Sequence, residues 1–178
     1  MKSKITDLRV TKKAILLFAL ISLASCQCKK NTTPAEAVAI TSECPKDGTC
    51  SVKLLKDKSI AVKKDEFGRL YYTLEESTSK NVVHYIYKRT VKGDLQDASY
   101  REEIVFEIDA KSENLHIADA ALENKQLLFG RFCFCRGQTG YYKINHGNLT
   151  VTNGKIVDLN FKTDEVPQII KHITVAIK

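Results

Sequence analysis

Short stretches in which apolar and polar residues alternate recur along most of the chain and constrain its fold more than any other feature. Successive side chains of a β-strand point to opposite faces of the sheet, so a period of two indicates strands with one buried face. The cleanest stretch is 101–108. Its inward-facing residues are expected to be Ile104, Phe106 and Ile108. Its acidic residues are expected to contact water, and these are Glu102, Glu103 and Glu107.

Such stretches follow one another at a spacing typical of all-β domains. They are 49–55, 59–63, 70–75, 82–89, 101–108, 127–135, 140–146, 149–152, 155–161 and 169–177. The pair Asn153-Gly154 between two of them predicts a type I′ hairpin turn. One short helix is expected at 119–124, with Asp119 as its N-cap. The sequence therefore predicts an all-β fold: a single antiparallel β-sandwich or β-barrel of nine or ten strands with one short helix.

The first 25 residues have the organisation of an export signal. A basic start is followed by the uncharged run 14–23, which is ten residues long. A transmembrane helix needs about 20 apolar residues, so this run fits a signal peptide better than a membrane span. It ends in Leu23-Ala24-Ser25-Cys26, which resembles the lipobox of bacterial lipoproteins. The resemblance implies that the Cys26 thiol receives a lipid, that the preceding bond is cleaved, and that acyl chains anchor the protein.

The same resemblance implies a location in the cell envelope. In lipoproteins of two-membrane bacteria, Asp after the lipidated Cys favours the inner membrane, and Gln27 at this position therefore favours the outer membrane. Lys29-Lys30 replaces the acidic cluster of surface-exported lipoproteins, which favours the periplasmic face. The expected parts are a signal peptide (1–25), a lipidated flexible tether (26–43) and a β-rich globular domain (44–178). Residues 35–40 form at most one weak helical turn of this tether.

The basic character of the chain comes largely from the segment expected to be removed. The chain has 28 Lys and Arg against 21 Asp and Glu, a net charge of +7. Residues 1–25 contain five of the bases and one of the acids, which leaves 23 against 20. The remainder has no clustered basic run of the kind that nucleic-acid binding needs. The expected partners are therefore a membrane, through the lipid, and an apolar or small ligand or another envelope protein.

Four cysteines are candidates for disulfides, because an exported chain enters an oxidising compartment. They are Cys44, Cys50, Cys133 and Cys135. A local Cys44–Cys50 bridge is geometrically easy, but it leaves Cys133 and Cys135 to each other. On one extended strand their Cβ atoms would lie about 6–7 Å apart, beyond the usual disulfide spacing of about 3.8 Å. The prediction is therefore that the loop 44–50 packs beside the strand of Cys133 and that the two pairs cross-link.

Residues 130–142 concentrate thiols, arginines and aromatic rings, and they supply the binding candidates. These candidates are Arg131, Arg136, Tyr141 and Tyr142. A second interpretation makes Cys133 and Cys135 a thiol redox pair, with Arg131 or Arg136 lowering a thiol pKa. A third makes them half of a soft-metal site completed by Cys44 and Cys50 or by His146, without a standard ligand spacing.

The sequence contains no recognised catalytic motif. It lacks the Gly-x-Ser-x-Gly nucleophile motif and a glycine-rich phosphate loop, and its four histidines are scattered, with His84 expected to be exposed. Asp94, Asp97, Glu102 and Glu103 are interpreted as a solvated rim. The leading hypothesis is a membrane-anchored lipoprotein with a non-enzymatic β-rich binding or structural module and no cofactor. The alternative is a thiol redox or metal-binding envelope protein.

Overall fold

The structure is a computed structural model that describes residues 38–91, 93, 97–111 and 113–178. The expected signal peptide, the lipidation site Cys26 and most of the expected tether lie outside the described residues, as does Asp94. Within those ranges, no helix has the length and apolar character needed to cross a membrane.

Twelve strands and one short 3₁₀-helix make up the described part of the chain, rather than nine or ten strands. The elements are β1 (Val38–Ile40), β2 (Gly48–Leu55), β3 (Lys58–Lys64), β4 (Leu70–Glu76), β5 (Lys80–Arg89), β6 (Tyr100–Asp109), β7 (Leu115–Ala118), η2 (Asp119–Lys125), β8 (Leu128–Cys133), β9 (Gly140–Lys143), β10 (His146–Thr152), β11 (Ile156–Lys162) and β12 (His172–Ile177). All ten predicted strands are present, and β1 and β7 are additional.

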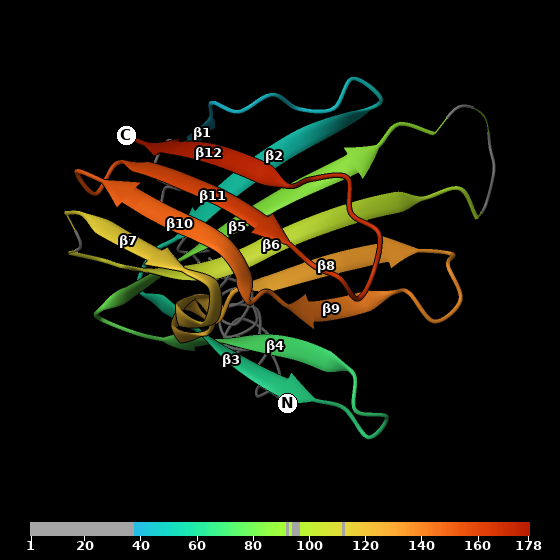
Figure 1. Ribbon diagram of the computed structural model, residues 1–178, viewed down its shortest axis with the longest axis horizontal. Coiled ribbons are helices and arrows are strands. Elements are labelled where there is room, and N and C mark those ends of the chain that lie inside the picture. Colours follow the sequence, from blue (N-terminus) through green and yellow to red (C-terminus); the bar gives the residue numbers. More distant parts are fainter. Residues whose placement is uncertain (1–37, 92, 94–96, 112) are drawn as a thin grey trace, which may run out of the picture. The chain divides into compact units, whose positions relative to one another are not determined.

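The strands pair antiparallel in two sheets that pack face to face as a β-sandwich (Figure 1). The smaller sheet has the order β1-β12-β11-β10-β7, and the larger has the order β2-β5-β6-β8-β9-β4-β3. The all-β prediction is confirmed. Strand β1 lies inside the expected tether and pairs with β12, with Val38 opposite Ile177. The sandwich therefore begins before residue 44, and residues 38–40 are extended rather than helical.

The core between the sheets is formed by the alternating residues that the sequence predicts. Burying these side chains stabilises the fold, at roughly 25 cal/mol per Å² of apolar surface. The largest completely buried side chains of the cluster include Tyr85, Tyr87, Ile104, Phe106, Phe129, Leu149, Leu159 and Ile173. They come from β5, β6 and β8 of the larger sheet and from β10, β11 and β12 of the smaller one.

Two local predictions have different outcomes. Asn153 and Gly154 have φ angles of 53° and 63°, and the Lys155 amide donates to the Thr152 carbonyl at 3.0 Å. This confirms the type I′ turn between β10 and β11. The short helix is present as η2, but Asp119 is not its N-cap: Ala118 occupies that position, and the Asp119 carboxylate accepts a hydrogen bond from the Gly147 amide.

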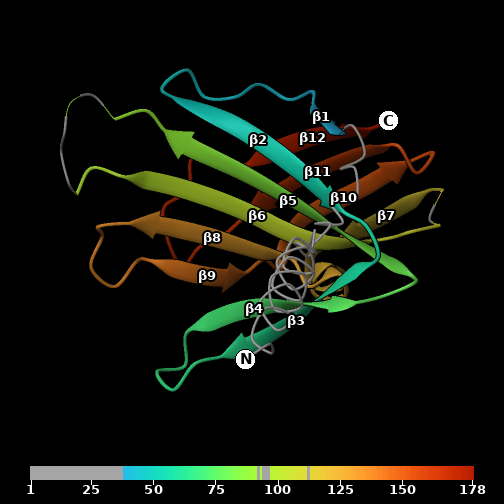
Figure 2. The same cartoon turned by 180° about the vertical axis from the view of Figure 1, so that it is seen from behind.

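The larger sheet curls so that β3 contacts the outer face of β5 and β6. A second, smaller core forms there from Ile60, Val82 and Val105. The Ile60 amide donates to the Glu107 carboxylate at 2.6 Å. Glu103 and Glu107 are each only 6% exposed, so the prediction that they contact water is wrong. They point away from the main core, as the alternation requires, but residues of β3 and β4 cover that face where the sheet curls. Figure 2 shows the larger sheet from this side, with β3 and β4 at its lower end.

Candidate functional site

The four candidate cysteines form two local disulfides. Cys44 is bonded to Cys50 and Cys133 to Cys135, with Cα–Cα distances of 5.8 Å and 5.1 Å. The predicted cross-link between the loop 44–50 and the Cys133 strand is therefore wrong. The prediction assumed that Cys133 and Cys135 lie on one extended strand. In the structure β8 ends at Cys133 and the chain bends at Phe134, which brings the two cysteines within bonding distance.

A completely buried carboxylate lies on the inner face of β6 near this disulfide. The sequence predicts that Glu102 contacts water, but its side chain has no exposed surface, so this prediction is wrong. It accepts hydrogen bonds from the amides of Ile169 (2.7 Å) and Ile170 (2.8 Å) and from the Tyr100 hydroxyl. Because burying a charge costs free energy unless it is hydrogen-bonded, these donors are what make the position tenable. Ile169 and Ile170 precede β12, so Glu102 joins the two sheets.

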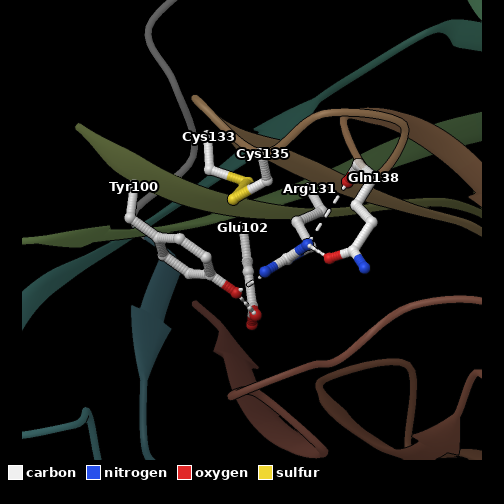
Figure 3. Close-up of a disulfide and its surroundings, with 6 residues drawn as sticks. All are labelled: Tyr100, Glu102, Arg131, Cys133, Cys135 and Gln138. Atoms are coloured by element: carbon white, nitrogen blue, oxygen red, sulfur yellow. Dashed lines mark hydrogen bonds between the residues drawn. A yellow bond between two sulfur atoms is a disulfide. The ribbon is translucent and has the colours of Figure 1, made fainter. Parts of the chain in front are cut away.

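Arg131 of β8 is also buried, with 8% of its surface exposed. Its guanidinium donates to the Gln138 side-chain oxygen at 2.6 Å and to the Tyr100 hydroxyl at 3.4 Å, and it lies 5.5 Å from the centroid of the Tyr100 ring. The Tyr100 hydroxyl therefore bridges the guanidinium of Arg131 and the carboxylate of Glu102, beside the disulfide (Figure 3). Burial, and then the hydrogen bond to Glu102, raise the pKa of Tyr100 to about 12.

The outer face of β6 carries a second buried carboxylate with its own partners. Glu103 accepts a hydrogen bond from the Tyr141 hydroxyl at 2.7 Å, and it pairs with His84 at 3.1 Å and Arg101 at 2.7 Å. His84 is therefore largely buried rather than exposed. Burial alone would raise the pKa of Glu103, but the hydrogen bonds from His84 and Tyr141 outweigh it and hold the pKa below its usual value.

The loop 134–139 separates two surface grooves. The first, here called the disulfide groove, has a volume of about 540 Å³, and its lining includes Lys88, Arg89, Arg101, Phe132, Cys133 and Phe134. The second, here called the tyrosine groove, has a volume of about 750 Å³, and its lining includes Lys64, Arg69, Tyr141, Tyr142, Lys143 and Glu165. Thr139 lines both. Phe134, between the two bonded cysteines, is 79% exposed.

The structure separates the four binding candidates. Tyr141 and Tyr142 both line the tyrosine groove, although the alternation along β9 points them to opposite faces. Arg136 is exposed in the turn that follows the disulfide. Arg131 is buried and hydrogen-bonded to the loop, so it supports the loop from below and does not line either groove.

Sequence reasoning missed Tyr100, Glu102 and Gln138 as members of this site. For Glu102 a signal was present, because residue 102 has the same parity as Ile104, Phe106 and Ile108 and so belongs to the inward face. The charge of Glu102 nevertheless led to the prediction that it contacts water, against the inward face that this parity indicates. Gln138 gave no signal, because its role depends on the course of a loop.

The described residues around the Cys133–Cys135 disulfide offer no set of ligands for a metal ion. Cys133 and Cys135 are bonded to each other, and among the residues that the structure describes no group of three or more His, Cys, Asp or Glu side chains is placed to hold a metal ion. Comparison with models of protein families, with curated proteins and with solved structures finds no match to this chain.

Proposed function

We propose that this chain is a lipid-anchored protein of the cell envelope whose β-sandwich binds an anionic, partly apolar partner at the two grooves beside the loop 134–139. The lipobox-like segment ending in Cys26 supports the anchor. Gln27 and Lys29-Lys30 support the periplasmic face of the outer membrane. The partner on this account is an acidic segment of another envelope protein.

The observation that carries the binding proposal is the charge of the two grooves. Six of their lining residues are cationic, against two acidic residues, Asp97 and Glu165. The three arginines among them are paired with carboxylates of their own domain, in Arg69–Asp65, Arg89–Asp47 and Arg101–Glu103. The three lysines are exposed and form no ion pair within the described part of the chain, and they are Lys64, Lys88 and Lys143.

Aromatic residues line the same grooves beside these free charges. Tyr141 and Phe132 contact each other edge to face, and the Arg101 guanidinium lies 4.5 Å from the centroid of the Phe132 ring. Lysine charges attract an acidic partner over several ångströms, whereas aromatic faces supply most of the contact free energy at protein interfaces. The arrangement therefore favours a partner in which acidic and apolar side chains alternate.

The anchor is tested by Cys26→Ser. Without the thiol there is no site for the acyl chains, so we expect the protein to leave the membrane fraction or to remain unprocessed. The measurement is membrane fractionation followed by the mass of the intact chain. A Cys26→Ser protein that still sediments with membranes at mature length contradicts the anchor.

Binding is tested with a labelled peptide of alternating Glu and Phe. The groove variant Lys64→Glu/Lys88→Glu/Lys143→Glu is compared with a control variant of equal charge, Lys111→Glu/Lys155→Glu/Lys171→Glu, whose lysines are exposed and lie outside both grooves. Removing three favourable charges at about 0.5–1 kcal/mol each weakens binding about 10- to 100-fold in the groove variant. Equal affinities of the two variants, measured by fluorescence anisotropy at low salt, contradict the proposed site.

A further inference from the structure

We propose that the Cys133–Cys135 disulfide is redox-active and oxidises the thiols of partly unfolded proteins that dock in the disulfide groove. This activity adds to the binding proposed above and does not depend on the lipid anchor or on the acidic partner. It rests on the size of the disulfide loop, on the buried cation next to it, and on the accessibility of the bond to a client.

The two disulfides of the domain close loops of different size. Cys44–Cys50 encloses five residues, whereas Cys133–Cys135 encloses only Phe134. The stabilisation that a disulfide gains from loop closure falls as the loop becomes shorter. The shorter bridge therefore contributes less to the folded state.

The register of the larger sheet gives the reduced form an alternative conformation. Cys133 is the last residue of β8 and pairs with Tyr100 of β6, and the bend at Phe134 brings Cys135 back toward Cys133. Once the bond is reduced, Phe134 and Cys135 are free to continue the extended course of the strand, in which the two sulfur atoms separate. Reduction therefore relieves a local constraint, and a disulfide whose dithiol form is favoured is the more oxidising one.

Arg131 supplies a positive charge for the thiolate that forms on reduction. It lies two residues before Cys133 on the same strand, and hence on the same face. Its hydrogen bonds to Gln138 and Tyr100 hold the guanidinium between those two side chains, on the side of the disulfide where Glu102 also lies (Figure 3). Its side chain forms no ion pair with a carboxylate among the described residues. A cation beside a cysteine stabilises the thiolate, which makes that cysteine a better leaving group.

The bond is accessible from the disulfide groove, because Cys133 lines that groove. Phe134 projects beside it with 79% of its surface exposed, and Phe132 and Tyr100 line the same groove. The exposed ring of Phe134, the residue between the two bonded cysteines, is available to pack against the apolar side chains that an unfolded protein exposes. The client class is therefore a reduced protein that has not completed its fold.

The exchange proceeds in two displacements. A client thiolate attacks the Cys133 sulfur and forms a mixed disulfide, and the Cys133–Cys135 bond breaks with Cys135 leaving as a thiolate. A second client thiolate then attacks the client sulfur of the mixed disulfide, which forms the client disulfide and releases the Cys133 thiolate. Two electrons pass from the client to the cysteine pair, and the two protons of the client thiols pass to it or to solvent. Oxidised glutathione, a small-molecule disulfide, takes up these electrons in the next cycle.

The first test is a redox titration of the full-length protein in glutathione buffers. Thiols are trapped by alkylation, and the two cysteine-containing peptides are quantified separately by mass spectrometry. We expect Cys133–Cys135 to be reduced at a ratio of reduced to oxidised glutathione about tenfold or more below that which reduces Cys44–Cys50. Reduction of both pairs at the same ratio overturns the proposal, as does a peptide map that links residues 44–50 to 131–136.

The second test measures turnover with reduced, unfolded ribonuclease as client and oxidised glutathione as oxidant. We expect the wild-type protein to accelerate client disulfide formation, Cys133→Ser/Cys135→Ser to abolish the acceleration, and Cys44→Ser/Cys50→Ser to retain it. Phe134→Ser is expected to slow turnover without changing the glutathione ratio at which the pair is reduced, which separates docking from chemistry. No acceleration by the wild-type protein, or equal acceleration by Cys133→Ser/Cys135→Ser, overturns the proposal.

Discussion

Replacing Glu102 by Ala removes the acceptor that joins the two sheets. The carboxylate accepts from two backbone amides, Ile169 and Ile170, and from the Tyr100 hydroxyl. Ile170 is buried, and Glu102 has no exposed surface, so water does not replace the lost oxygens at this position. A buried donor left without an acceptor costs about 1–3 kcal/mol. Two orphaned amides and the space left by the side chain therefore predict a loss of about 3–5 kcal/mol in the free energy of unfolding.

Two further variants make the measurement specific. Glu102→Gln retains one carbonyl oxygen but places an NH₂ group against a donor, so we expect an intermediate loss of about 1–3 kcal/mol. Glu75→Ala, on an exposed position of β4, controls for the removal of an acidic residue from a strand, and its expected effect is within about 0.5 kcal/mol. The order of stability should be Glu75→Ala above Glu102→Gln above Glu102→Ala.

Urea denaturation with linear extrapolation gives these free energies. Hydrogen exchange adds a local measurement, because the Ile169 and Ile170 amides should lose protection in Glu102→Ala by more than the global change accounts for. If Glu102→Ala and Glu75→Ala unfold at the same urea concentration, the carboxylate does not hold the sheets together and the reasoning fails.

Two further predictions concern the hairpin and the outer face. Gly154→Val places a β-branched residue at a φ of 63° and should lower the free energy of unfolding by about 1 kcal/mol or more, whereas Gly154→Asn should cost less; equal melting midpoints for the two variants contradict this. The lowered pKa of Glu103 means that its ionised form is favoured in the folded state. Its contribution to stability is therefore complete above the unfolded pKa of about 4.3 and is lost as the pH falls through the lower folded pKa. Glu103→Gln should therefore lose less of its free energy of unfolding than the wild-type protein over this acidic range, as measured by urea denaturation at a series of pH values. A pH dependence equal to that of the wild-type protein would contradict the assignment.

The alternation of apolar residues predicted the strands of the larger sheet well, but it failed to predict exposure where that sheet curls over its own outer face. Ile104, Phe106 and Ile108 are buried as expected, because the pattern reports the face that each side chain takes. Glu103 and Glu107 take the opposite face, as predicted, but β3 and β4 cover that face. The curl of a sheet is set by contacts between residues far apart in the chain, and a local pattern does not contain them.

The disulfide connectivity failed for a related reason. The prediction assumed that the strand continues to Cys135, and on that assumption Cys133 and Cys135 are too far apart to bond. The strand ends two residues earlier, in a turn that includes Gly137 at a φ of 72°. The short strands β1 and β7 were missed because three or four residues contain too little alternation to be distinguished from loop.

The contact between Ile60 and Glu107 also bears on how copies of this protein behave beside one another. In an antiparallel ladder each residue directs its amide either to its neighbour strand or away from it, and the Ile60 amide points away from β4, at the free edge of the sheet. An open edge invites strands from other chains, and proteins often protect it with charged groups. Here a carboxylate of the same molecule already occupies the amide. The lipid anchor proposed above would hold copies of this protein at high local concentration on one membrane, and this internal cap removes one route to edge-to-edge aggregation.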